Sequence, residues 1–335
     1  MPGGPKCQVD AAKAWLAARE AELLPVRYFH LVFTLPRPIP GIAHQNKREL
    51  YNLLTRASAD TVIKIAADPK HLGARVGVTS VLHTWGSAMT HHPHVHMIVP
   101  GGGLSADGTG WIACRGNFFL SVRVLSCLYR RLILDGLARR HKVGKLHFFA
   151  GHARCVDRAA FDAVLQPLRR IDGVVYAKEP FAGPGAVPAY LSRYTHRVAV
   201  SNNRLIPMDD QGITFRVKDC RLNGPGRHKT VTLGTDEFIR RFLIRALPKG
   251  QHRIRHCGFF GNANRAANNT RIRELLGAET PVRGKVRDDT IERSDAHRRV
   301  LAFPCPCCGG QLIIVETIAP EQHPRAPPGT ARAAA

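Results

Sequence analysis

Two apolar segments joined by a short polar loop constrain the fold of this chain more than any other feature. Residues 76–86 (VGVTSVLHTWG) and 94–100 (HVHMIVP) have the β-branched and apolar side chains that are typical of strands. A parallel pair of strands needs a crossover of a dozen or more residues, and the loop is too short to supply it. The sequence therefore predicts an antiparallel pair.

The rest of the chain predicts a mixture of helices and strands. Residues 28–36 (YFHLVFTLP) are aromatic and β-branched and predict a buried strand, and residues 173–178 (GVVYAK) predict another. Residues 205–217 predict a hairpin that turns at residues 210–212. Apolar periodicity and capping signals predict helices over residues 9–24, 45–67, 120–141, 159–171, 188–199 and 235–247.

The charge of the chain narrows the class of partner. The 335 residues include 49 Lys and Arg against 25 Asp and Glu, a net charge of +24, and such an excess favours a polyanion. No apolar run is long enough to cross a bilayer and no basic anchor helix is evident, so nucleic acid is favoured over a membrane. No secretory signal is evident, and the nine cysteines then indicate thiols or metal ligands in a reducing, cytoplasmic compartment.

Four histidines lie between residues 91 and 96 (HHPHVH). Side chains alternate between the two faces of a strand, so His94 and His96 share one face while Val95 points to the other. Pro93 removes one donor from the ladder, which predicts that His92 belongs to the turn before the strand. Two imidazoles at this spacing on a rigid strand can bind one divalent ion, which would orient a phosphate and neutralise its charge.

Other interpretations of these histidines stay open from the residues alone. Short histidine runs are often solvated loops, although the apolar residues that follow this one argue against a loop. Metallo-hydrolases of the β-lactamase type continue as HxHxDH, whereas Met97 and Ile98 follow His96 here. A metal-dependent hydrolase of small molecules would also leave the positive charge unexplained.

Two tyrosines, Tyr190 and Tyr194, are four residues apart in the segment AYLSRYTHR. On a helix this spacing places both hydroxyl groups on one face. Arg193, His196 and Arg197 surround them with positive charge that suits a phosphate. A tyrosine oxygen can attack phosphorus when a metal ion polarises the phosphodiester, although packing alone also explains such a pair.

Four blocks of the chain together resemble the rolling-circle insertion-sequence transposases of bacteria. These are the two-tyrosine members of a superfamily of single-strand endonucleases named for a His-hydrophobic-His motif. The blocks follow the order of the family and occupy residues 83–105, 174–184, 189–205 and 236–265. The resemblance extends over nearly the whole chain.

The resemblance implies an α+β fold in which helices pack on one face of an antiparallel sheet, with a helical C-terminal region. It implies a nuclease dependent on Mg²⁺ or Mn²⁺ that nicks single-stranded DNA and links a tyrosine to the 5′-phosphate. His94 and His96 match the metal ligands. For the third ligand His92 is expected first, with His83 or a polar residue of the tyrosine helix as alternatives.

The same resemblance assigns Tyr190 and Tyr194 as the nucleophiles, with Tyr194 expected to be indispensable. Cys305 and Cys308 form a CxxC that resembles half of a zinc ribbon and would bind Zn²⁺. Members of the family begin with a cysteine-rich zinc domain, of which Cys7 would be the remaining ligand. The residues expected to contact DNA are Lys178, Arg193, His196, Arg197, Arg253 and Arg255.

The sequence thus predicts a transposase whose partners are single-stranded DNA at transposon ends and targets, with no membrane partner and with self-association possible. The alternative is a truncated remnant that binds DNA but no longer transposes. The expected segments are residues 1–25 as the remnant of a zinc-binding region with a linker helix, 26–200 as the catalytic domain, 201–300 as a basic DNA-binding region, 301–315 as a zinc-knuckle-like segment, and 316–335 as a disordered tail.

Overall fold

A computed structural model gives the arrangement of the chain, and it divides into two compact units, residues 15–282 and residues 1–14 with 283–335. Three predicted segments lie wholly or mostly outside the described residues. They are the helix over residues 188–199 that carries the two tyrosines, the helix over residues 9–24, and the CxxC segment. The structure describes residues 20, 22–171, 174–178, 187, 200, 204–206, 212–218, 224–244, 246–278, 300–304 and 311–313.

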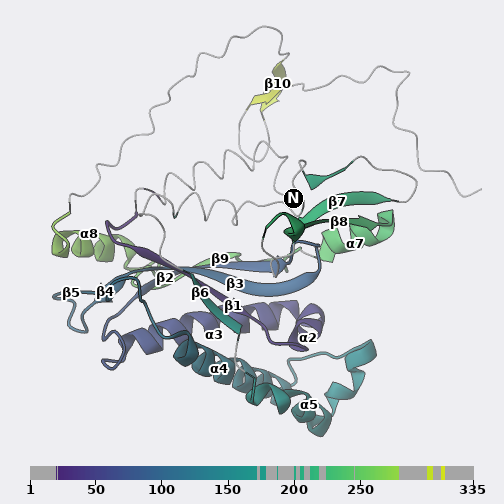
Figure 1. Cartoon of the computed structure of the whole chain (residues 1–335), viewed down its shortest axis with the longest axis horizontal. Coiled ribbons are helices and arrows are strands. Elements are labelled where there is room, and N and C mark those ends of the chain that lie inside the picture. The colour runs from purple at the N-terminus through teal and green to yellow at the C-terminus, as the bar shows by residue number, and fades with distance from the viewer. Residues whose placement is uncertain are drawn as a thin grey trace, which may run out of the picture. The chain divides into compact units, whose positions relative to one another are not determined.

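The larger unit is built on a five-stranded antiparallel sheet with the strand order β6-β1-β3-β2-β9 (Figure 1). The predicted antiparallel pair is confirmed as β2 and β3, and β3 is the central strand. The strands are β1 (Tyr28–Thr34), β2 (Gly77–Trp85), β3 (His91–Pro100), β6 (Val174–Lys178) and β9 (Ile254–Gly258).

Helices cover one face of this sheet (Figure 1). The long helices α3 and α4 pack on each other and on the sheet, and α2 and α5 extend the layer. Tyr129 of α4 shows how the layer is attached, because its ring meets Phe33 edge-on at 5.1 Å and its hydroxyl donates to the carbonyl oxygen of Thr34. The helices are α2 (Ile39–Gln45), α3 (Lys47–Ala67), α4 (Val122–Lys142) and α5 (Arg158–Leu165).

The α+β class and the position of the helices on one face of the sheet are confirmed. The C-terminal region contains strands as well as the predicted helices. Its elements are the 3₁₀ turn η4 (Pro225–Arg227), the strands β7 (Ile213–Lys218) and β8 (His228–Leu233), and the helices α7 (Thr235–Ile244) and α8 (Arg265–Leu275). The smaller unit contains one described hairpin, β10 (Val300–Pro304) with β11 (Gln311–Ile313).

Several predicted boundaries differ from the structure for local reasons. The helix predicted from residue 45 begins at Lys47, because Asn46 separates α2 from α3 and hydrogen-bonds the carbonyl oxygens of Ile42 and His147. The helix predicted to residue 171 ends at Leu165 because Pro167 has no N–H to continue it, and a 3₁₀ turn, η2 (Pro167–Arg169), follows.

Of the hairpin predicted over residues 205–217, the described residues show a bridge between Leu205 and Phe215 and a hydrogen bond from the N–H of Ile206 to the carbonyl oxygen of Thr214. The main partner of β7 is β8, which pairs with it along six residues. Short elements complete the unit: β4 (Gly102–Leu104) with β5 (Trp111–Ala113), and the 3₁₀ turn η1 (Ala150–Val156). Among the described residues no helix has both the length and the apolar character needed to span a membrane.

The prediction that His92 precedes the strand is wrong, because β3 begins at His91. Pro93 is accommodated by an irregularity in the pairing with β2, where Trp85 lies opposite His91 and His83 lies opposite His94. Between these two pairs β2 advances by two residues while β3 advances by three, and this difference is a β-bulge. A proline fits at a bulge because the residue there does not need a backbone N–H for the ladder of hydrogen bonds.

The two faces of the sheet differ in character along β3. Val95, Met97 and Val99 are buried against the helices, whereas His94, His96 and Ile98 point to the other face. At one end of that second face Ile98 packs in a small apolar cluster with Phe259, Phe260 and Ile272 of α8. The histidines occupy the remaining end.

Gly77 should be a packing requirement of this apolar cluster. A Cβ at residue 77 would overlap the ring of Phe259 and lie 2.8 Å from Cδ2 of Phe260. Gly77→Ala should therefore lower the free energy of unfolding by about 1–3 kcal/mol, measured by urea denaturation. Gly151→Ala is the control, because a Cβ there meets no atom within 4 Å. Adding Phe259→Leu to Gly77→Ala should restore part of the loss, and an unchanged stability of Gly77→Ala would contradict the packing argument.

Candidate metal centre

Three histidines from the two central strands meet on the face of the sheet that the long helices leave uncovered. His83 lies directly opposite His94 in the pairing of β2 with β3, and His96 is two residues further along β3. One nitrogen from each of the three rings lies within 4.8 Å of the others. The rings stand steeply to one another, with centroids 4.7–5.3 Å apart and interplanar angles of 67–77°. We call His83, His94 and His96 the histidine triad.

The second nitrogen of two triad rings is already engaged. Nδ1 of His94 lies 2.7 Å from the carbonyl oxygen of His92, to which it donates, so Nε2 is the free nitrogen of that ring. Nδ1 of His96 lies 2.9 Å from Nε2 of His30 on β1. Nε2 is therefore the nitrogen through which each of these two rings would bind a metal ion. A nitrogen without a proton is the form that binds a metal ion.

Burial keeps His94 uncharged near neutral pH. His83 and His96 are buried, with 4% and 8% of their surface exposed, and His94 is half-buried. Loss of hydration lowers the pKa of His94 from 6.5 to about 4, and it also lowers the pKa of the neighbouring His92. No proton then competes with a metal ion at His94 near pH 7.

The triad fits a divalent transition-metal ion. Metal–imidazole bonds of about 2.0–2.2 Å bring ligand nitrogens to within about 3–3.5 Å of each other, so modest side-chain rotations from the observed spacing suffice. Three imidazoles on adjacent, paired strands would hold an ion from one side and leave its other side open. Such an open side is where a substrate oxygen binds in catalytic metal sites.

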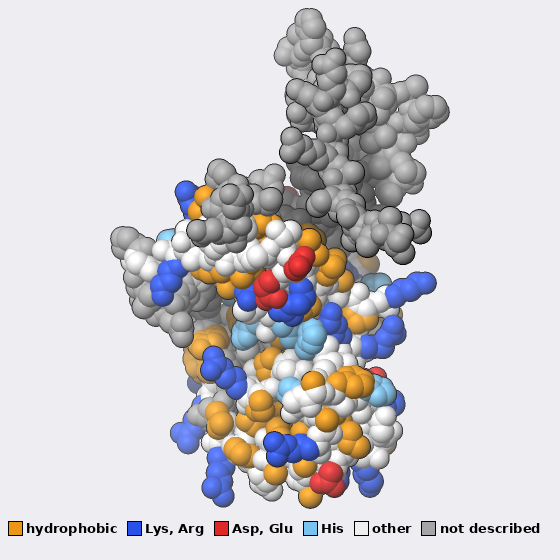
Figure 2. Space-filling model, turned by 90° about the vertical axis from the view of Figure 1, so that its right-hand side faces the viewer, with side chains coloured by type: hydrophobic (Ala, Val, Ile, Leu, Met, Phe, Trp, Pro, Cys, Tyr) orange, Lys and Arg blue, Asp and Glu red, His pale blue; other side chains and the backbone are white. Residues whose placement is uncertain are grey.

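A stack of rings connects the triad to an arginine. The ring of Trp85 lies 5.4 Å from that of His83 and nearly parallel to it, at 9°. The guanidinium of Arg253 lies over the same Trp85 ring at 5.5 Å from its centroid. Figure 2 shows histidine side chains gathered on one face of the molecule with Lys and Arg side chains around them. Arg253 places a positive charge beside the triad, which suits an anionic substrate.

The predicted site residues fall into different places. His94 and His96 are brought together as predicted, but the third member of the group is His83, and the exposed His92 stands outside it. The other predicted residues of the tyrosine helix and the CxxC lie outside the described residues: Tyr190, Arg193, Tyr194, His196, Arg197, Cys305 and Cys308.

The two arginines predicted on one DNA track differ in their surroundings. Arg255 pairs with Ser80 and points to the helical face, where it donates to the side-chain oxygen of Asn52 on α3. Arg253 instead lies against Trp85 beside the triad. Lys178 ends β6, the strand at the edge of the sheet. Arg240 and Arg241 of α7 both pair with Glu237, so part of their charge is neutralised within the helix.

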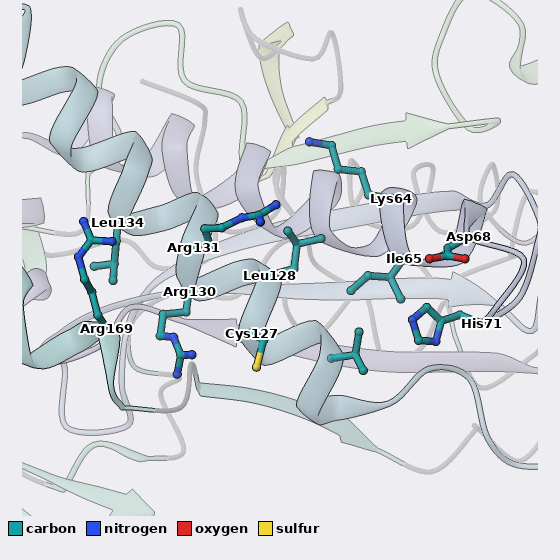
Figure 3. Close-up of a pocket in the computed structure, with 11 residues that line it drawn as sticks. Lys64, Ile65, Asp68, His71, Cys127, Leu128, Arg130, Arg131, Leu134 and Arg169 are labelled. Carbon is teal, nitrogen blue, oxygen red and sulfur yellow. The ribbon is translucent and has the colours of Figure 1, made fainter.

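A basic hollow lies on the helical side of the sheet. It has a volume of about 610 Å³ and lies between the end of α3, the start of α4 and η2. Figure 3 shows that Arg130 and Arg131 point away from each other, and Arg169 pairs weakly with Asp135 at 4.0 Å. These groups do not converge on a common point, whereas the triad does.

Two residues of the site were not anticipated from the sequence. His30 was included only as part of a predicted strand, although it is the one imidazole in the apolar run YFHLVFT. Strand alternation places its side chain on the face of the sheet away from Leu31 and Phe33. Trp85 ends the strand that carries His83. A polar residue in a buried strand is the signal that could have singled out His30.

Comparison with known proteins places these residues in a family. A family model described as "Putative transposase" matches residues 77–268, which contain the whole triad. A second model, described as "Transposase zinc-binding domain", matches residues 3–35.

Two curated relatives match over most of the chain. The chain is 50% identical over 316 residues to "Putative transposase y4qJ" of Sinorhizobium fredii, covering 93% of this chain and 79% of the relative. It is 25% identical over 317 residues to "Transposase for insertion sequence element IS801" of Pseudomonas savastanoi pv. phaseolicola, covering 94% and 73%.

Solved structures give only a slight likeness. The conjugative relaxase TrwC in complex with a 27-mer DNA is 14% identical, covers 75% of this chain and 74% of its own, and has a TM-score of 0.27. A metal-bound structure of TrwC with its DNA is likewise 14% identical, covers 76% and 73%, and has a TM-score of 0.28. A likeness this slight has no bearing on the function of the chain.

Acid should destabilise the metal-free protein through its buried histidines. Burial lowers the pKa of both His91 and His94 to about 4, against 6.5 when hydrated, so the unfolded chain binds more protons between these values. The free energy of unfolding should therefore fall as pH drops from about 6.5 to 4, by at most about 3 kcal/mol per histidine.

Urea denaturation with a chelator present, at pH 7 and at pH 5, measures this loss. His94→Gln should lose less stability on acidification than the parent protein does. The exposed His252 provides the control, since His252→Gln should lose as much as the parent. Equal losses in all three proteins would contradict the assignment.

Proposed function

Because this chain belongs to the rolling-circle insertion-sequence transposases of bacteria, we propose that it nicks and rejoins single-stranded DNA at the histidine triad. The observation that carries the proposal is the convergence of His83, His94 and His96 on one point of the sheet, inside the segment that matches the transposase family. The excess of positive charge supports a DNA substrate.

His83, His94 and His96 are the proposed metal ligands. His83 replaces His92 as the third ligand because it faces His94 directly across the strand pair, whereas His92 contributes its carbonyl oxygen to orienting the His94 ring. Imidazole nitrogens suit transition metals better than they suit Mg²⁺, so of the two expected ions Mn²⁺ is the better match. When bound, the ion would polarise a phosphodiester and offset its negative charge.

Tyr194 and Tyr190 are the proposed nucleophiles. The tyrosine oxygen forms a bond to phosphorus while the bond from phosphorus to the 3′ oxygen breaks, and the proton lost by the tyrosine is balanced by the one that the 3′-hydroxyl gains. One phosphodiester is exchanged for another, so the reverse reaction with a new 3′-hydroxyl can rejoin the strands without an external energy source. Two tyrosines allow two such exchanges in succession.

The DNA backbone is proposed to run over the triad and past Arg253. Arg193, His196, Arg197 and Lys178 are further proposed contacts. Arg255 has the role of holding Asn52, on the evidence of its hydrogen bond, rather than contacting DNA. Cys305 with Cys308 would bind Zn²⁺, and Cys7 would remain from the zinc-binding region that matches residues 3–35. A protein with bacterial DNA as its substrate would act in the cytoplasm.

The chemistry is tested by a covalent-adduct assay. Purified protein, labelled single-stranded DNA from the ends of its own element, and Mn²⁺ should give a protein–DNA adduct that survives denaturing electrophoresis. Tyr194→Phe should abolish the adduct, because Tyr194 is the nucleophile proposed to be indispensable and Tyr190 is not expected to replace it. His94→Ala and His83→Ala should lower adduct formation at least 100-fold, because each removes one of three ligands.

His92→Ala is the matched control for His83→Ala, and it should retain most of the activity because its contribution is a backbone carbonyl. If His92→Ala abolishes the adduct while His83→Ala does not, the ligand assignment is wrong. If the parent protein binds DNA but forms no adduct, the nuclease proposal is wrong, and the result favours a remnant that only binds DNA.

Arg253 should contribute to the salt dependence of DNA binding. Each phosphate contact to single-stranded DNA adds about 0.7 to the slope of log K against log salt. Arg253→Gln should reduce the slope by about that amount in filter-binding titrations, and Arg253→Lys should leave it nearly unchanged. Arg56→Gln is the control, because Arg56 lies on α3 with 82% of its side chain exposed, away from the triad. A slope that Arg253→Gln leaves unchanged would exclude the contact.

A further inference from the structure

His30 of β1 is one of the most deeply buried polar residues among those described, with 1% of its surface exposed. Its Nε2 lies 2.9 Å from Nδ1 of His96, and the two rings are nearly parallel at 5° with centroids 5.1 Å apart. In the pairing of β1 with β3, Val32 lies opposite His96 and His30 lies opposite Ile98. His30 therefore reaches His96 along the diagonal of the strand pair, on the same face as the triad.

This contact defines the proton positions of both rings. Because Nδ1 of His96 contacts His30, the proposed function has His96 bind the ion through Nε2, and a metal ligand carries no proton on the binding nitrogen. The proton of the neutral His96 ring then sits on Nδ1, which donates to Nε2 of His30. His30 in turn must carry its own proton on Nδ1.

We infer that His30 is a positioning residue for the metal centre, which holds His96 in the tautomer and ring orientation that present Nε2 to the ion. The inference rests on the proposed function, since it gives His96 the role of a ligand. Metal-bound histidines generally donate their other N–H to an acceptor that fixes the ring, most often a carboxylate or a carbonyl oxygen. Here a buried imidazole provides the acceptor.

The choice of a neutral acceptor has a consequence for charge. A carboxylate in this position would add a negative charge to a buried site, whereas His30 adds none. Among the described residues, the group that could hold a metal ion contains three histidines and no acid. The full charge of a divalent ion would then be available to the phosphodiester of the DNA.

Two replacements of His30 separate positioning from packing. In Gln the side-chain oxygen can lie near the place of Nε2, so His30→Gln keeps an acceptor for His96. Leu fills similar space without any acceptor, so His30→Leu removes it. Val32→Ala is the matched control. Val32 lies on β1, as His30 does, and is directly opposite His96 in the strand pair, but its side chain has no hydrogen-bonding atom.

The first readout is Mn²⁺ affinity, measured by calorimetry on the full chain. His30→Leu should weaken Mn²⁺ binding by about 10- to 100-fold. His30→Gln should stay within about threefold of the parent, and so should Val32→Ala. Thermal unfolding of the metal-free variants identifies any that fail to fold, and His30→Gln keeps the test decisive if His30→Leu is among them. Equal affinity of His30→Leu and the parent would overturn the inference, as would equal weakening by His30→Gln, His30→Leu and Val32→Ala.

The second readout is independent of metal. Nitrogen-15 NMR of the metal-free protein reports which ring nitrogen of His96 carries the proton. The parent and His30→Gln should show the proton on Nδ1, whereas His30→Leu should show a mixture of tautomers. If the parent binds no Mn²⁺, the proposed function fails, and the tautomer still decides the role of His30: unchanged populations in His30→Leu would overturn the inference and a shift confined to that variant would support it.

Discussion

The antiparallel pairing of β2 with β3 is the interaction on which the rest of the site depends. It sets His83 opposite His94 and Val81 opposite His96, and strand alternation then directs all three triad rings to the same face. A slip of one residue in this register would turn His83 toward the helices and a buried apolar side chain toward the triad. The helical layer prevents the slip, because Val95, Met97 and Leu82 are fully buried against it.

The fold therefore uses the two faces of one sheet for different purposes. Burial of apolar side chains against α3 and α4 stabilises the unit and fixes the register, and the opposite face is left to carry polar groups. Those groups are costly to bury unless they are hydrogen-bonded. The contact of His96 with His30 and the hydrogen bond of His94 to the carbonyl oxygen of His92 help to meet that requirement.

The bulge at Pro93 connects a local sequence feature to the geometry of the site. Pro93 cannot donate to the ladder, so two residues of β2 span three of β3 at this point. As a result His83 pairs with His94, while Trp85, next on the same face of β2, pairs with His91. The Trp85 ring stacks on the His83 ring, and the guanidinium of Arg253 lies over the Trp85 ring. Reading Pro93 as the end of the strand missed this arrangement, because the strand continues beyond the irregularity.

The sequence by itself determined the antiparallel pair, the α+β class with helices on one face, and the placing of His94 and His96 on one side of a strand. The antiparallel pair and the shared face of His94 and His96 follow from loop length and from a period of two residues, which are local properties of the chain. The α+β class with helices on one face is what the resemblance to the transposase family implied. The motif blocks of the sequence indicated that family. Only the tertiary structure decided that His83 completes the triad, that Arg255 faces the helices, and that His30 supports His96. Each of these depends on which elements are neighbours and in what register. His30 and His96, for example, are 66 positions apart along the chain, and no local pattern signals their contact.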